Sequence, residues 1–391
     1  MSKQSDWRIT TLDNLELTES DLSVIEKLRD TISSGRIITY QFSEEQKGLM
    51  KQWYEDLLSK NPSIVDTYIP PNGRALVSEI DAFGKFLLEK IFVGEKDLEL
   101  LQNLRSISRD PSLTAISISG FNDHSDRIFS YLVDGAMSDL MRIHDSQDET
   151  ENHKHIFIDP RQLDIRNFGQ VGGVIEPHAD DLYKEDEKVN VLLLTTVCNE
   201  TGVPTELYSL NNVIQKVEEK HSKEYADKCL LVLYHGRATF RSGVNVGGSE
   251  VTATHNIISF NGNVVDWCFD MRFFGEQTRM YDVQSCDEKG LVSHEMVKDA
   301  VSLIKEVIYE CEPVRGSKAT GDFLAVANMK SVHARIQKVI PTQEQLEKQE
   351  RGEGFRDLYR AKGRQHRINS FTKWEDRVKP EAKTGPQITG Q

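Results

Sequence analysis

The segment Gly172-Gly-Val-Ile-Glu-Pro-His-Ala-Asp-Asp-Leu-Tyr contains the residues best suited to chemistry. In an extended chain, residues i and i+2 point to the same side, so His178 and Asp180 would bring one imidazole and one carboxylate together. A site of two histidines and one carboxylate, with open positions for further ligands, suits iron(II). The pair therefore predicts two of the three ligands of such a site.

The third ligand should come from another strand that returns beside the first. The run Leu231-Val-Leu-Tyr ends at His235, 57 residues after His178, and we interpret it as a strand with a histidine at its end. His255 is the alternative. We favour His235 because its position after an apolar run resembles a ligand at a strand end.

The elements around these residues indicate a β-rich core. From His155 to Phe274 the chain has short β-branched and aromatic runs separated by turns, which is typical of an antiparallel sandwich or barrel. One helix is expected near 211–221 and another near 293–309. Residues 15–110 are mainly helical in pattern, and Ser43 is a candidate cap for the helix that follows it.

These motifs resemble the iron(II)/2-oxoglutarate dioxygenase superfamily. His178-Ala-Asp180 is similar to its proximal motif, and His235, within His235-Gly-Arg237, is similar to its distal ligand. The resemblance covers about residues 160–275 and does not reach a subfamily. It implies a double-stranded β-helix (jelly-roll) core, with iron(II), 2-oxoglutarate and O2 as cofactors and co-substrates.

The co-substrate anchor departs from the family pattern. The family usually has an arginine roughly 9 to 17 residues after the distal histidine, where it pairs with the far carboxylate of 2-oxoglutarate. Neither Arg nor Lys lies in that window after His235. The candidates are Arg272, which would fit if His255 were the ligand, and Arg241. Thr196 is a further candidate, since one of the two threonines Thr195 and Thr196 should face inward.

Composition excludes several classes of protein. The formal net charge of -14 argues against a broad nucleic-acid interface. Five dispersed cysteines predict free thiols in a reducing compartment, and no apolar leader or membrane-length run is visible. We expect a cytoplasmic protein that binds a small molecule and neither a membrane nor nucleic acid. The oligomeric state stays open.

The chain divides into three parts in this interpretation. Residues 1–150 form a mainly helical region that packs on the core, and residues 151–340 form the catalytic double-stranded β-helix with a flanking helix. Residues 341–391 are a polar tail that is basic, because Lys and Arg outnumber Asp and Glu in it. We expect it to be partly disordered, because it contains few large apolar residues.

These observations predict a protein of the α+β class that functions as an oxygenase. It would hydroxylate, desaturate or cyclise a small molecule with iron(II) and 2-oxoglutarate. A cupin-like metal enzyme without 2-oxoglutarate is one alternative, motivated by the missing arginine. A non-enzymatic binding protein with a decayed metal site is the other.

Overall fold

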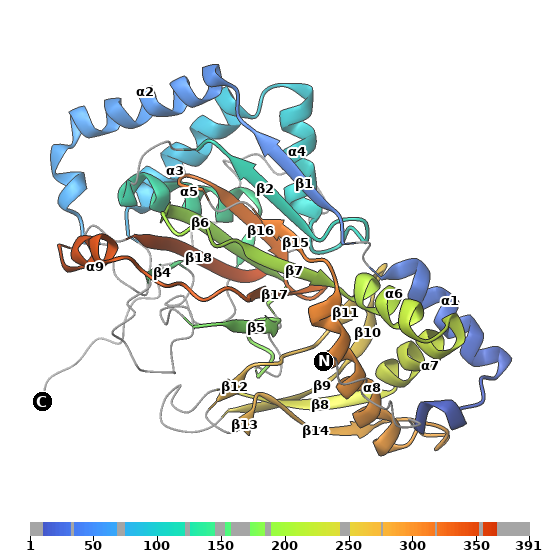
Figure 1. Ribbon diagram of the computed structural model, residues 1–391. Coiled ribbons are helices and arrows are strands. Elements are labelled where there is room, and N and C mark those ends of the chain that lie inside the picture. Colours follow the sequence, from blue (N-terminus) through green and yellow to red (C-terminus); the bar gives the residue numbers. More distant parts are fainter. Residues whose placement is uncertain are drawn as a thin grey trace, which may run out of the picture.

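The computed structural model describes residues 11–32, 35–68, 75–121, 126–144, 153–157, 173–183, 189–242, 251–274, 277–316, 319–351 and 355–365. These residues form a mixed α/β structure in which two β-sheets face one another and helices cover the outside (Figure 1). None of the helices in these ranges is long and apolar enough to cross a membrane.

The larger sheet has the order β1-β2-β16-β6-β18, with β3 and β4 both paired to β18. All its pairs are antiparallel except the parallel pair of β1 and β2. Its strands are β1 (Ile37–Gln41), β2 (Ala115–Ser119), β3 (Ile143–His144), β4 (His153–Phe157), β6 (Val191–Asn199), β16 (Phe323–Ala327) and β18 (Arg356–Gln365).

The smaller sheet lies against one face of the larger sheet (Figure 1). It is antiparallel and consists of β15 (Val314–Gly316), β7 (Thr205–Ser209), β17 (Ser331–Arg335) and β5 (Ile175–His178) in that order. A buried apolar cluster fills the space between the two sheets: Ala115, Leu192, Leu194, Leu207, Leu324, Val326 and Leu358. The cavity described below lies in this same layer.

Four helices pack on the other face of the larger sheet: α2 (Glu44–Lys60), α3 (Val77–Phe86), α4 (Glu95–Ser106) and α5 (Arg127–Leu140). Strand β6 is therefore covered on both sides, and its residues from Val191 to Cys198 are all buried. Leu193 faces the helices whereas Leu192 and Leu194 face the smaller sheet. A strand covered on both faces needs such a continuous apolar run.

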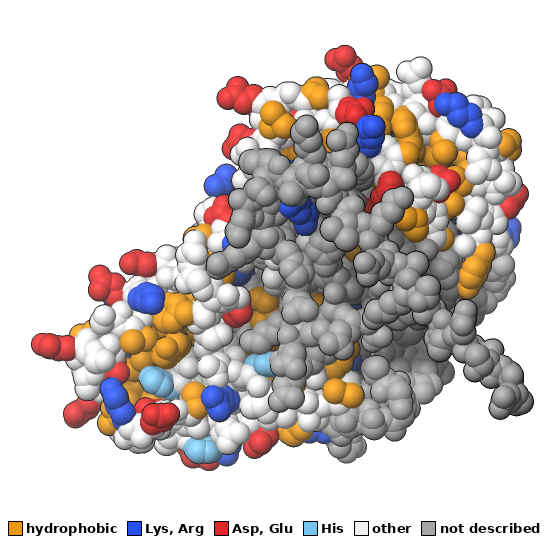
Figure 2. All heavy atoms as spheres, turned by 180° about the vertical axis from the view of Figure 1, so that it is seen from behind, with side chains coloured by type: hydrophobic (Ala, Val, Ile, Leu, Met, Phe, Trp, Pro, Cys, Tyr) orange, Lys and Arg blue, Asp and Glu red, His pale blue; other side chains and the backbone are white. Residues whose placement is uncertain are grey.

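A second buried core lies beside the two facing sheets and is built from the remaining elements (Figure 1). Its helices are α1 (Glu19–Thr31), α6 (Leu210–Lys220), α7 (Lys223–Tyr234) and α8 (His294–Val307). Its small sheets contain β8 (Gly236–Arg241), β9 (Thr252–Asn256), β10 (Ile258–Asn261), β11 (Val264–Trp267), β12 (Phe273–Phe274), β13 (Gln277–Thr278) and β14 (Met280–Ser285). On the face seen in Figure 2, acidic and basic side chains are interspersed.

Several local predictions are confirmed. Ser43 caps α2, with Gln46 completing a capping box, and α6 and α8 lie where helices were expected. The mixed helix-and-sheet class is confirmed as well. The first 150 residues, expected to be mainly helical, also contribute β1, β2 and β3 to the larger sheet.

Two segments differ from their predictions. Leu231 to Tyr234, interpreted as a strand, is the last part of helix α7, which begins after the N-cap Ser222. The segment 341–365, assigned to a basic tail, contains helix α9 (Gln343–Glu350) and then β18 between β6 and β4. Residues 366–391 of the predicted tail lie outside the described residues.

Candidate metal centre

Three side chains with the composition of an iron(II) site converge at one end of the smaller sheet. His178 ends β5, Asp180 follows it, and His333 lies directly opposite His178 in the antiparallel partner β17. The two imidazole rings have centroids 4.1 Å apart, and His178 Nε2 is 3.5 Å from Asp180 Oδ1. One nitrogen or oxygen from each residue lies within 4.8 Å of the others.

Hydrogen bonds to the main chain hold this geometry. His178 Nδ1 donates to the carbonyl of Glu176 at 2.7 Å, which orients the ring and leaves Nε2 as the acceptor nitrogen. Asn328 is fully buried, accepts from the Asp180 amide at 2.9 Å and donates to the Asp180 carbonyl at 3.2 Å. These hydrogen bonds therefore fix the ring of His178 and the main chain that carries Asp180.

The loop after the pair is fixed by a buried ion pair. Asp181 has a left-handed backbone with φ of 59°, which aspartate tolerates better than most residues. Its carboxylate accepts a 2.6 Å hydrogen bond from Lys362 Nζ of β18, and both side chains are buried. The loop that carries Asp180 is thereby tied to the larger sheet.

The electrostatic surroundings favour the protonation states that bind metal. Burial, together with the charge of Arg272, lowers the pKa of His178. Burial alone would raise the pKa of Asp180. The neighbouring imidazole of His178, 3.5 Å away, and the charges of Arg360 and Lys362 outweigh it and hold this pKa well below its ordinary value. Near pH 7 the site thus offers a neutral imidazole and an ionised carboxylate.

The donor set fits iron(II). Asp180 Oδ2 is buried and has no hydrogen-bond partner among the described residues; its nearest ion-pair partner is Arg360 Nη1 at 3.6 Å. A buried carboxylate oxygen without a hydrogen bond is costly unless a ligand compensates it. Two imidazole nitrogens and one carboxylate oxygen on one side of a metal are the arrangement used by non-haem iron(II) oxygenases.

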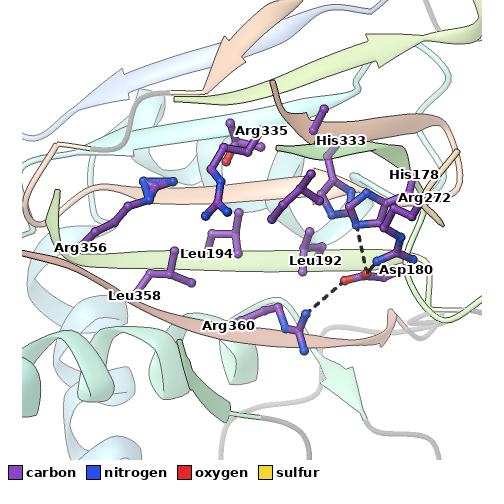
Figure 3. A pocket seen from close by; sticks show the side chains of 13 residues that line it. His178, Asp180, Leu192, Leu194, Arg272, His333, Arg335, Arg356, Leu358 and Arg360 are labelled. Atoms are coloured by element: carbon purple, nitrogen blue, oxygen red, sulfur yellow. Dashed lines mark ion pairs between the residues drawn. The ribbon is translucent and has the colours of Figure 1, made fainter. Parts of the chain in front are cut away.

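A cavity of about 110 Å³ opens beside the three residues, between the two sheets. Figure 3 shows His178, Asp180 and His333 at one end, and Arg335 and Arg356 toward the other. Leu192, Leu194 and Leu358 supply apolar side chains between the two ends. The remaining lining residues are Ile175, Thr205, Arg272, Ala334 and Arg360.

The far end of the cavity contains two buried guanidinium groups. Arg356 is 3% exposed, and its Nη1 donates to the Val203 carbonyl and to Asn199 Oδ1. Its Nε has no hydrogen-bond partner in the part of the chain that the structure describes. Burial lowers the pKa of Arg356 to about 10, and burial with the neighbouring charge of Arg356 lowers that of Arg335 to about 9. This end of the cavity would bind an anion.

Two of the three predicted ligands meet in the structure, and His235 does not join them. His235 is the C-cap of α7, where its carbonyl accepts from the Cys286 amide at 2.8 Å. The alternative, His255, lies in β9 opposite Ala238. Neither histidine lines the cavity, among the residues described.

Of the three residues predicted to bind the co-substrate, one lines the cavity and two do not, among the residues described. Arg272 does line the cavity, at the metal-ligand end. Arg241 stacks over the Tyr281 ring, with its guanidinium carbon 3.6 Å from the ring centroid. It is not among the described residues that line the cavity. Thr196 is buried in β6, but the described cavity lining does not include it.

Sequence reasoning missed His333, Arg356 and Arg360. One signal for His333 is present: Phe323-Leu-Ala-Val-Ala and Ser331-Val-His-Ala-Arg form two strands joined by the short connection Asn328-Met-Lys. Arg356 and Arg360 lie in a segment whose basic composition hid its strand character. Helix α9 separates β17 from β18, so Arg356 follows His333 at a longer spacing than the family pattern led us to expect.

No family model matches the chain, and no curated protein matches its sequence. Solved structures do match. The non-heme iron oxygenase OrfP in complex with Fe and alpha-ketoglutaric acid is 13% identical, with a TM-score of 0.56 over 85% of this chain and 95% of that chain. An asparagine oxygenase in complex with Fe(II), 2S,3S-3-hydroxyasparagine and succinate is 11% identical, with a TM-score of 0.55 over 83% and 93%. The predicted resemblance is confirmed at the level of the fold, which this chain shares with these non-heme iron oxygenases.

Proposed function

We propose that this chain is a non-haem iron(II) and 2-oxoglutarate-dependent oxygenase with a double-stranded β-helix core. His178, Asp180 and His333 hold the iron. The observation that carries the proposal is the convergence of these three side chains within 4.8 Å beside a cavity, in a fold shared with non-heme iron oxygenases. In this assignment His333 replaces His235 as the distal ligand.

The chain's own residues would divide the work along the cavity. Arg356, with Arg335 beside it, binds the far carboxylate of 2-oxoglutarate, since its buried Nε lacks a hydrogen-bond partner among the described residues. Arg272 lies 3.7 Å from the Asp180 carboxylate, too close to the metal ligands to take the distal end of the co-substrate. The leucines between the two ends exclude water from the reacting atoms.

Bound iron(II) would supply the activation of O2 and the oxidation of a C–H bond, with 2-oxoglutarate as the electron source. Hydroxylation of a small molecule is the proposed outcome, and desaturation or cyclisation would use the same residues. The cupin-like alternative lacks a role for Arg356, and the decayed-site alternative lacks one for Asp180, so neither is favoured.

An anaerobic titration tests the proposal. Purified apoprotein is titrated with iron(II) and then with 2-oxoglutarate, and the weak visible charge-transfer band of the chelated co-substrate is recorded. We expect one iron per chain and a band that is lost in His178→Ala, Asp180→Ala and His333→Ala. His235→Ala is the matched control and should keep both iron and band.

The outcomes separate the possible functions. Iron binding without the band would remove 2-oxoglutarate and favour the cupin-like enzyme, whereas failure to bind iron would leave a binding protein. Loss of iron in His235→Ala with retention in His333→Ala would overturn the ligand assignment.

A further inference from the structure

The cavity beside the metal centre is positively charged, although the whole chain carries -14. Four arginines line it: Arg272, Arg335, Arg356 and Arg360. Asp180 is the only carboxylate among the described lining residues. On the face in Figure 2, by contrast, acidic and basic side chains are interspersed. The surplus of arginine is therefore a local property of the cavity.

Arg272 is neutralised within the chain. Its Nε and Nη2 donate to the two carboxylate oxygens of Asp270 at 3.0 and 2.6 Å, and both residues are buried. The pair presents the remaining nitrogen, Nη1, toward Asp180 Oδ1 at 3.7 Å. Asp270 is thus occupied by an internal guanidinium and does not offer its charge to a ligand.

Among the described residues, Arg360 has no comparable hydrogen-bonded carboxylate. Its Nη1 is 3.6 Å from Asp180 Oδ2, beyond hydrogen-bond distance, and its Nε is buried without a hydrogen bond among the described residues. The side chain is 23% exposed and lies on the same face of β18 as Arg356 and Leu358 (Figure 3). The carboxylate in this ion pair is the one assigned to the metal.

Among the described lining residues, the charges of the loaded site do not balance without a further anion. The two charges of iron(II) are matched by those of 2-oxoglutarate, and the single charge of Asp180 can offset either Arg356 or Arg360 but not both. At least one positive charge remains before Arg335 is counted. Desolvated cations are costly unless they are paired.

We propose that the substrate is an anion, a small molecule with a carboxylate or another acidic group that Arg360 binds beside the neutral Arg272–Asp270 pair. This inference rests on the proposed function and names the substrate class of that site. A cationic substrate would find no uncommitted carboxylate among the described lining residues. The chain should therefore differ from OrfP, which has been solved with (3S)-hydroxy-L-Arg.

Matched acids and amides test the charge of the substrate. Protein loaded anaerobically with iron(II) and saturating 2-oxoglutarate is titrated with L-aspartate, L-glutamate, L-asparagine, L-glutamine and L-arginine. Binding is followed by calorimetry and by changes in the visible band. We expect at least one acid to bind about tenfold more tightly than its amide, with the band retained, and arginine to bind no better than the amides.

Arg360→Gln should abolish this preference while keeping the 2-oxoglutarate band. Arg237→Gln removes the same charge from an exposed residue of β8 and should leave the preference unchanged. Equal binding of acid and amide, tighter binding of arginine, absence of acid binding, or displacement of 2-oxoglutarate by the acid would overturn the inference. If 2-oxoglutarate itself gives no band, the proposed function fails first and the inference falls with it.

Discussion

Asn328 is the residue whose removal should best reveal how the metal centre is held in place. It is fully buried in the connection between β16 and β17, and its side chain makes three hydrogen bonds to the main chain. It accepts from the Asp180 amide at 2.9 Å and donates to the carbonyls of Asp180 at 3.2 Å and Val189 at 2.7 Å. The amide side chain of Asn328 therefore holds in place the main chain of Asp180, a proposed metal ligand.

Replacement of Asn328 by Ala removes all three bonds and leaves a buried amide and two carbonyls unsatisfied. Each lost hydrogen bond contributes about 1 kcal/mol net, and an unsatisfied buried group costs about 1 to 3 kcal/mol. Some of these groups will find water, so we expect the free energy of unfolding to fall by about 3 to 5 kcal/mol. The affinity for iron(II) should fall about 10- to 100-fold, as for other residues that orient metal ligands.

Urea denaturation of the apoprotein and anaerobic iron(II) titration of the folded variant measure the two effects separately. Asn263→Ala, in the exposed turn between β10 and β11, is the control and should change neither quantity. A loss of stability below about 1 kcal/mol together with unchanged iron affinity would refute the assigned role of Asn328.

Three further predictions concern other parts of the molecule. Burial lowers the pKa of Lys330 to about 7, so between pH 7 and 10 the unfolded chain binds more protons than the folded one. Stability in urea should therefore rise with pH across this range, and less so in Lys330→Met; an identical pH profile in the variant would contradict this. Arg356→Gln should weaken 2-oxoglutarate binding about 10- to 100-fold in band titrations without changing iron stoichiometry, and an unchanged affinity would exclude Arg356 as the anchor. A Cβ added at Gly316 would lie 2.5 Å from a methyl carbon of Leu324, so Gly316→Ala should cost about 1 to 3 kcal/mol. The additional change Leu324→Val should recover part of that loss in thermal unfolding, and full additivity of the two changes would exclude the clash.

The proximal half of the site could be predicted because its geometry is local. His178 and Asp180 are two residues apart in one extended segment, so their convergence requires no knowledge of the rest of the fold. The third residue depends on which strand pairs with β5, and that pairing joins segments 155 residues apart. Sequence patterns do not determine such a pairing, so several histidines remained possible.

His235 was favoured because a short apolar run has no distinctive period. Leu230 to Leu233 are all buried in α7, whose surroundings cover several sides of the helix. A helix segment buried on all sides and a buried strand both appear in the sequence as a short run of apolar residues. Ser222, which caps the helix through the Tyr225 amide, was the local signal that could have separated them.

Strand β18 was misinterpreted for a different reason, namely its composition. Arg356, Asp357 and Lys362 are buried charged residues, and such residues are rarely buried unless they are paired or bind a ligand. Asp357 pairs with Arg127 of α5 at 2.8 Å, on the face that packs against the helices. The charges that suggested a solvated tail are therefore accounted for by partners distant in sequence.

Side chains along β18 alternate between the cavity and the core under the helices, and this alternation places its charged residues at the proposed site. Arg356, Leu358 and Arg360 face the cavity, whereas Tyr359 and Ala361 pack into the core beneath the helices. Lys362 continues the cavity-facing row and fixes Asp181 next to the metal centre. A single strand thus provides the proposed co-substrate anchor, the proposed substrate contact and the tether of the loop that carries Asp180. Because these groups lie on one face of a single strand, four and two residues apart, their spacing along the cavity is set by the strand itself. A shift of its register by one residue would turn all of them away from the site.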